Sequence, residues 1–516
     1  MRHSITFIRL AIALGLVAVS CAQPKVDPSV ASTTAAVTAA ATGTSPGNLD
    51  VLFMVDNSSE MIVMQQKLAS QIPGFVTALQ NLPMGLPNIH IAVVSSDLGA
   101  PGDVTSSIMC TATGDNGQFR FGATSGVSVA PQPGPDGGAT GGASGGNDAG
   151  ASACAGANLN QGATFISNVD GVANYTGDLS TLLSCMTALG DKGCGFEHQL
   201  ASISRALGAD GLPAPSSNAG FLRPDAQLAI IVLSNEDDCS APANTELYSL
   251  NGGQQNIANP LGPIGNYRCN QFGHLCVDPA AAGSTCLTEP PLQPPADVQG
   301  TASGPTLSLT DCESDDSRGM LTSVKTLVSG LRALKADPNN QIVVGAIVAP
   351  ASPYTVAWVP AQGGQNTQPG ELWPVVENSC GPVGGYVNPA GQTATDGSWG
   401  DPAVRISQWV QAFGPNGVTA SICDGSYANA FSAIASKIGA HLPGGSGSVA
   451  SSADAGAGGT ASALPICPNG ISAGQSNGLS SGGCSCDVDP GRATPWTLVL
   501  FGTLLVFARR RRASGR

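Results

Sequence analysis

The sequence has few charged and few aromatic residues. Charged residues make up 11% and aromatic residues 5%, whereas roughly a quarter of an ordinary globular protein is charged. Glycine and proline are abundant instead, at 67 and 37 residues, so much of the chain is predicted to be loop and linker. Acidic residues outnumber basic ones, 35 to 21, and no basic stripe is present. This excludes nucleic-acid binding, which needs Lys and Arg to neutralise phosphates.

Motifs of common enzymes are also missing. Only five histidines occur, with no HExxH sequence, no phosphate-binding loop and no dinucleotide fingerprint. The segment 142–146 matches GxSxG by letter, but it lies in a glycine-rich stretch. A nucleophile elbow requires a preceding strand and a following helix. We therefore predict that the chain is not an enzyme.

The amino terminus has the pattern of an export signal. Arg2 and Arg9 precede or flank an apolar run, 10–19, that is too short to span a bilayer. The run ends Ala-Val-Ser-Cys21. This resembles the lipobox of bacterial lipoproteins, in which lipid is attached to the cysteine. An ordinary signal peptide, 1–21, is the alternative. Residues 22–48 are predicted to be a flexible linker.

The carboxyl terminus combines three features. Cys484 and Cys486 are followed by a short apolar segment, 496–508, and a cluster of four arginines. Thirteen helical residues span about 20 Å, which is less than a ~30 Å hydrocarbon core. The order of parts in 484–516 resembles the C-terminal sorting signal of myxobacterial surface proteins, after a low-complexity linker, 443–483. A plain tail anchor is the alternative, and the membrane is reached by the lipid or by this segment.

Fifteen cysteines favour an oxidising compartment. We predict an exported protein of the cell envelope, in the outer membrane or at the cell surface. Cys185 and Cys194 flank a loop and are predicted to form a disulfide. The pairing of the others cannot be deduced from the sequence.

One folded region is predicted, 49–442. Five short apolar runs without clean alternation predict parallel strands covered on both faces, and these are 50–55, 89–95, 228–234, 341–348 and 418–422. Apolar residues at helical spacing lie between them. This order indicates an α/β fold with a doubly wound, mostly parallel sheet. Segment 164–167 is predicted to add an antiparallel edge strand beside the second strand.

Three long irregular insertions are predicted, at 98–162, 239–318 and 349–401. Each follows a strand, so all three are expected at the edge formed by the carboxyl ends of the strands, where open α/β sheets bind ligands. The second insertion is rich in cysteine, which predicts a subdomain held together by disulfides.

The first strand leads into Asp56-Asn57-Ser58-Ser59-Glu60-Met61. This resembles the metal-ion-dependent adhesion site of von Willebrand factor A domains, whose motif is Asp-x-Ser-x-Ser. Asp56 and Ser58 match the motif, and Glu60 stands where the second Ser belongs. The resemblance covers 49–442 apart from the insertions.

The resemblance implies a divalent cation, Mg²⁺ or Ca²⁺, held by oxygen ligands with one position left for a partner. The family's Thr position falls near 193–197, which contains no hydroxyl, and Asn235 stands at its Asp position. Glu60 could ligate directly, Asp237 could replace the missing Asp, and Asp97 could approach the site.

These observations leave three hypotheses. The first is a cell-surface adhesion module with a degenerate cation site that binds a protein or polysaccharide partner. The second is a metal-free structural envelope protein that assembles through its insertions. The third, a secreted hydrolase, has no motif to support it.

Overall fold

The computed structural model describes the folded part of the chain with short gaps. The described residues are 46–101, 110–122, 156–249, 260–279, 286–295, 304–360, 372–381, 396–445 and 464–467. The predicted export signal, lipid site at Cys21 and sorting signal with Cys484 and Cys486 lie outside them. Among the described residues, no helix combines the length and the apolar character that crossing a membrane requires.

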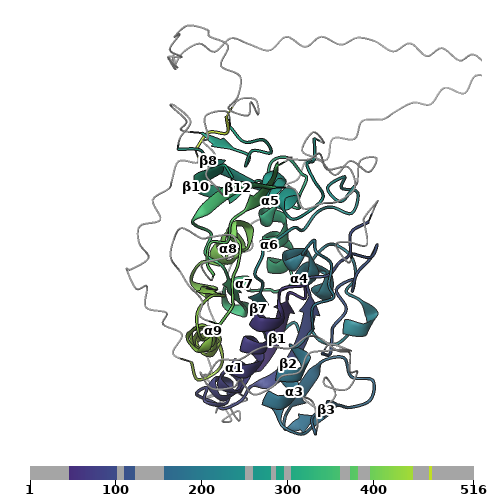
Figure 1. The fold of residues 1–516 in the computed structure, drawn as a ribbon. Coiled ribbons are helices and arrows are strands. Elements are labelled where there is room, and N and C mark those ends of the chain that lie inside the picture. Colours follow the sequence, from purple (N-terminus) through teal and green to yellow (C-terminus); the bar gives the residue numbers. More distant parts are fainter. Residues whose placement is uncertain are drawn as a thin grey trace, which may run out of the picture.

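A seven-stranded sheet forms the centre of the molecule, with strand order β14-β11-β7-β1-β2-β4-β5 (Figure 1). Its strands are β1 (Asn48–Val55), β2 (Asn88–Ser95), β4 (Ile166–Val169), β5 (Val172–Ala173), β7 (Gln227–Leu233), β11 (Ile342–Val348) and β14 (Gly417–Ser421). The five long or central strands pair in parallel, and β4 pairs antiparallel with β2. The predicted parallel strands and the antiparallel edge are therefore confirmed, with bounds within two residues.

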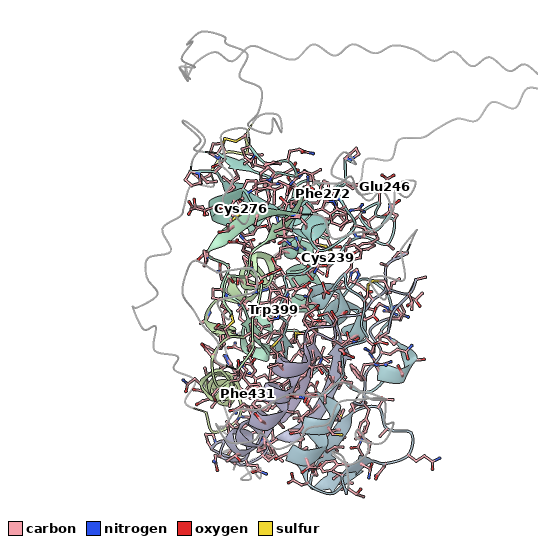
Figure 2. The ribbon with its side chains drawn as sticks, in the orientation of Figure 1. Cys239, Glu246, Phe272, Cys276, Trp399 and Phe431 are labelled. Atoms are coloured by element: carbon pink, nitrogen blue, oxygen red, sulfur yellow. A yellow bond between two sulfur atoms is a disulfide. The ribbon has the colours of Figure 1, made fainter. Side chains whose placement is uncertain are left out.

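Helices cover both faces of this sheet, because its strand side chains point alternately to two apolar cores. Phe53 faces one core, together with Phe75 and Phe431, and Leu52 faces the other, together with Trp409. Figure 2 labels Phe431 of the first core. The first core packs under α1 (Ile62–Gln80), α3 (Leu179–Met186) and α9 (Ala428–His441). The second packs under α4 (Gln199–Leu207), α6 (Val324–Arg332) and α8 (Val404–Gln411). This α/β arrangement is consistent with a Rossmann-like fold.

The insertions are more regular than predicted. Segments 239–318 and 349–401 contribute a second sheet with strand order β13-β12-β10-β8-β9 and one helix, α5 (Tyr267–Gly273). The strands are β8 (His274–Val277), β9 (Leu287–Thr288), β10 (Thr306–Ser314), β12 (Tyr354–Pro360) and β13 (Leu372–Val376). We call this sheet with α5 the inserted subdomain. It lies beyond the carboxyl ends of the central strands (Figure 1). Among its described residues, the first insertion contributes the short strand β3 (Asn158–Leu159), which pairs with β6 (Tyr175–Thr176).

Disulfides hold the inserted subdomain and its surroundings. The described bonds are Cys110–Cys194, Cys239–Cys269, Cys276–Cys312, Cys286–Cys467 and Cys380–Cys423. The predicted Cys185–Cys194 bond is wrong, because Cys194 pairs with Cys110 instead. Cys185 belongs to α3, which packs on the first core, whereas Cys194 packs with Phe196 and Tyr248 in a separate apolar cluster. Closeness in sequence did not bring the two sulfurs together.

Candidate functional site

Asp56 lies where β1 ends, at the carboxyl-end edge of the central sheet. Its carboxylate is fully buried and accepts hydrogen bonds from Ser58 N at 2.9 Å, Ser96 Oγ at 3.0 Å and Ser234 Oγ at 2.6 Å. Ser96 and Ser234 directly follow β2 and β7, so donors from three neighbouring strands meet at one carboxylate. Burial raises the pKa of Asp56, because a charge is costly away from water.

Ser58 is brought next to Asp56, as the sequence predicts. Its backbone N–H binds the Asp56 carboxylate, and its buried Oγ lies near enough to lower the pKa of Asp56. However, this oxygen satisfies no hydrogen-bond geometry with any described residue. Buried hydroxyls almost always have a partner, so an unpartnered one beside a buried carboxylate points to a missing ligand.

A group of acidic side chains lies beside Asp56. Glu197 precedes α4, Glu236 follows β7 and Asp401 precedes α8, and the three line a cavity of about 10 Å³. That volume admits about one water-sized sphere. Asn266, at the start of α5, donates a hydrogen bond from Nδ2 to Glu236. The inserted subdomain therefore covers this acidic cavity on the side of α5.

The electrostatics of this group are unfavourable to ionisation. Burial, followed by the charges of Glu236 and Asp56, raises the pKa of Glu197 well above its usual range. Burial also raises the pKa of Glu236 to about 7. The pKa of Asp401 is raised well above normal by burial and by the charges of Glu236 and Asp237, and its Oδ1 has no hydrogen-bond partner among the described residues. These carboxyl groups repel one another, and none of the ion pairs among the described residues includes Glu197, Glu236 or Asp401.

Glu60 is exposed and faces the same group. Its charge contributes to the raised pKa values of Glu236 and Asp401. Glu60 thus lies on the solvent side of the acidic cavity, and its role as a cation ligand stays a prediction.

Asp237 has a structural role. Its carboxylate accepts hydrogen bonds from the backbone N–H groups of Arg405 and Ile406 at 2.7 and 3.1 Å and pairs with His274 Nε2 at 2.8 Å. It therefore joins the start of α8 to β8 of the inserted subdomain. Asp237 also lines the acidic cavity, and its role as a replacement ligand stays a prediction.

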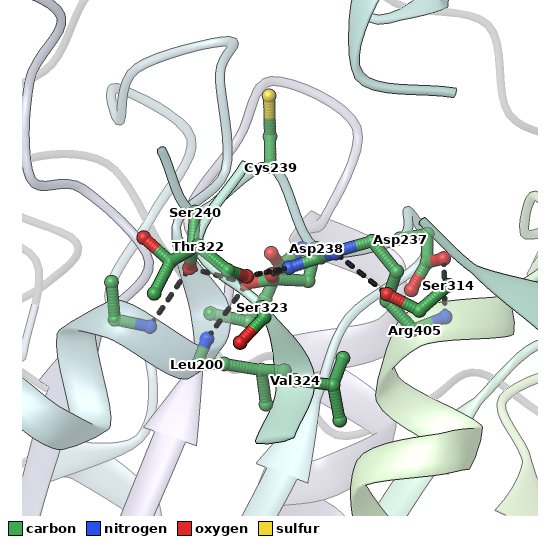
Figure 3. Close-up of polar contacts among 12 residues, drawn as sticks. Leu200, Asp237, Asp238, Cys239, Ser240, Ser314, Thr322, Ser323, Val324 and Arg405 are labelled. Atoms are coloured by element: carbon green, nitrogen blue, oxygen red, sulfur yellow. Dashed lines mark hydrogen bonds and ion pairs between the residues drawn. The ribbon is translucent and has the colours of Figure 1, made fainter. Parts of the chain in front are cut away.

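The neighbouring Asp238 forms the buried ion pair of this region. Its carboxylate binds Arg405 at 3.0 Å, Ser240 Oγ at 2.6 Å and Leu200 N at 2.9 Å (Figure 3). Arg405 also donates to Ser314 Oγ and to the Thr322 carbonyl. This network connects α4, α8 and the inserted subdomain below the acidic cavity.

Asp97 does not contact Asp56 through any recorded hydrogen bond. It accepts from Gly99 N at 2.8 Å and from the backbone of Cys194, which shapes the loop after β2. The preceding residue, Ser96, makes the contact with Asp56 instead.

Sequence reasoning missed Ser96, Ser234, Glu197, Asp401 and Asn266. The two serines could have been found, because each follows a buried strand that neighbours β1. Glu197 was seen only as a position without a hydroxyl. Asp401 and Asn266 lie far from Asp56 in sequence and had no local signal.

The oxygen donors near Asp56 are chemically suited to a hard divalent cation, which prefers carboxylate, hydroxyl and amide oxygens. Besides Ser58, Asn235 is buried with both side-chain polar atoms unpartnered. Within the described part of the chain, however, no three His, Cys, Asp or Glu side chains are already arranged as a metal-binding group. A cation would therefore need hydroxyl, amide or water oxygens in addition to carboxylates.

Neither the protein-family models nor the curated proteins include a match to this chain.

Proposed function

We propose that this chain is an exported, cell-surface binding module that holds a divalent cation, Mg²⁺ or Ca²⁺, at the carboxyl end of β1. Its fold and site are similar to those of a von Willebrand factor A domain. The observation that carries the proposal is the unpartnered Ser58 hydroxyl beside the buried Asp56 carboxylate. The five described disulfides support the proposed location outside the cytoplasm.

Asp56, Ser58 and Glu60 would hold the cation, and Glu236 would face it from the acidic cavity. When bound, the cation supplies a positive charge and an open coordination position for an oxygen of a protein or polysaccharide partner. Ser96 and Ser234 orient Asp56 by donating to both of its carboxylate oxygens. The inserted subdomain limits water access by covering Glu236 with Asn266.

Titration calorimetry of the purified chain with Mg²⁺, Ca²⁺ and Mn²⁺ tests this proposal. Ser58→Ala is the most informative variant. The hydroxyl has no well-aligned hydrogen-bond partner among the described residues, so its removal should change the melting temperature in EDTA only slightly. It should nevertheless weaken cation binding about tenfold or more, as expected for a lost metal contact. Asp56→Asn should abolish binding.

Asp424→Asn is the matched control, because Asp424 is an exposed carboxylate just beyond β14 at the same edge of the sheet. It should bind cations like the unmodified chain. Absence of binding heat in the unmodified chain, or equal heat with Asp56→Asn, would exclude the cation. The remaining hypothesis would then be a metal-free envelope protein that assembles through its insertions.

A further inference from the structure

A second cavity lies beside α4. It has a volume of about 490 Å³, within the roughly 300–1,000 Å³ range of small-molecule sites. We call it the α4–α6 pocket, since Ala201 and Arg205 of α4 and Leu327 of α6 line it together with Leu98 and Pro242 from two loops. The two cavities are lined by successive residues of the chain. Glu197 lines the acidic cavity, and His198 lines the α4–α6 pocket.

The walls of the pocket are fixed by covalent and polar contacts within the protein. The Cys110–Cys194 disulfide closes the loop after β2, and Cys239–Cys269 holds the loop after β7. His198 connects the two loops, because its Nε2 lies 2.8 Å from the Gly99 carbonyl and its Nδ1 lies 3.4 Å from the Tyr248 hydroxyl. A pocket built in this way is ready for a ligand without rearrangement, which favours affinity.

Most of the exposed wall surface is apolar, although hydroxyl side chains such as Ser204 and Thr326 also line the pocket, and Arg205 is the one Arg or Lys among the described residues of the lining. The Arg205 guanidinium donates Nε to Asn116 Oδ1 at 3.2 Å and Nη1 to the Pro213 carbonyl at 2.8 Å. Its Nη2 has no partner recorded among the described residues. Asp210 lies 3.6 Å from Nη1, which offsets part of the charge. Leu212 lies beside them at the mouth with 58% of its surface exposed.

We propose that the α4–α6 pocket binds a small amphipathic organic acid. Its apolar body would lie against Ala201, Leu98 and Leu327, and its single carboxylate would accept hydrogen bonds from Arg205. Charge-assisted bonds of this kind are shorter and stronger than neutral ones. Asp210 leaves too little positive charge for a dianion such as a phosphate monoester.

Titration calorimetry of the purified chain with octanoate tests the proposal, with 1-octanol and octylamine as the neutral and cationic comparisons. EDTA is present throughout, so that the cation site does not contribute. The expected order of affinity is octanoate, then octanol, then octylamine. Arg205→Gln should weaken octanoate binding about tenfold, the effect of losing one charged hydrogen bond, and leave octanol binding unchanged.

Ala201→Phe fills the pocket from α4 and should abolish binding of all three compounds. The melting temperature of Ala201→Phe without ligand shows whether this variant is folded. If it is not, Arg205→Gln still tests the proposal independently. Lys325→Gln is the matched control, an exposed cation on α6 outside the pocket lining, and should bind octanoate normally. No octanoate binding by the unmodified chain, or equal weakening by Lys325→Gln, would overturn the proposal.

Discussion

The buried carboxyl groups of Glu197 and Glu236 lie close together beside the acidic cavity, and burial and the charge of Glu236 raise the pKa of Glu197. None of the ion pairs formed by described residues includes either of them. Two neighbouring buried carboxylates repel each other, and burial raises the pKa of both, so a proton held by the pair stabilises it. Without a cation, the pair thus depends on a proton that becomes scarce as pH rises.

The first prediction concerns pH. The pKa of Glu236 is raised from its usual 4.5 to about 7, so the folded chain binds more protons than the unfolded chain between these values. The free energy of unfolding should therefore fall as pH rises from about 4.5 to about 7, by on the order of 1–3 kcal/mol. Urea unfolding in EDTA at pH 5 and pH 8 measures this. A free energy of unfolding that does not change with pH would contradict the raised pKa of Glu236. Excess divalent cation should reduce the loss of stability at high pH.

The second prediction concerns Glu236→Gln. A neutral amide removes the repulsion with Glu197, so the variant should be more stable than the unmodified chain at pH 8 in EDTA, with a flatter pH profile. It should also bind divalent cations more weakly, as calorimetry can show. Glu246→Gln, an exposed carboxylate of the inserted region (Figure 2), is the control and should change neither property.

The third prediction concerns Asp237→Ala. The variant would leave His274 and the start of α8 without their buried acceptor, and breaking such a buried pair costs about 3–5 kcal/mol. Urea unfolding at pH 7 measures this. The pKa of Asp237 is lowered, first among the stabilising causes by its hydrogen bond with His274. Its contribution is therefore present above its usual value of 3.8 and is lost as pH falls below it. A change under 1 kcal/mol would contradict the structural role.

The fourth prediction concerns the Cys286–Cys467 disulfide, which joins residues 181 positions apart. Closing so long a loop restricts the unfolded chain, and the chain-entropy model gives about 5 kcal/mol for it. The double variant Cys286→Ser, Cys467→Ser should have a free energy of unfolding that is lower by up to this amount. It should therefore unfold at a lower urea concentration. Unchanged unfolding would show that β9 and 464–467 are held by other contacts.

The central sheet was predictable because its strands are short, continuous apolar runs, a pattern typical of parallel strands that are buried on both faces. The position of Asp56 followed from the same pattern, since it terminates the first run. The relation of Ser58 to Asp56 followed from their spacing of two residues. These are local features, and local reasoning was sufficient for them.

The inserted subdomain was not predictable in the same way. β10 does alternate, with Leu307 and Leu309 buried between exposed neighbours, but its partners β8 and β12 lie far along the chain on either side of it. Asp401 joins Glu236 for the same reason, through the folding of distant segments. The disulfide prediction failed because cysteine pairing depends on such contacts.

The Cys286–Cys467 bond determines where the two ends of the folded part leave the molecule. Ile466 pairs beside Leu287 on the inserted subdomain, whereas Gly47 packs against Pro443 at the opposite pole (Figure 1). An attachment before Asn48 would turn the inserted subdomain outward to the surroundings. An attachment after Cys467 would turn the inserted subdomain toward the lipid surface. A pulling force between the two ends would then be carried by the folded domain and by the Cys286–Cys467 bond.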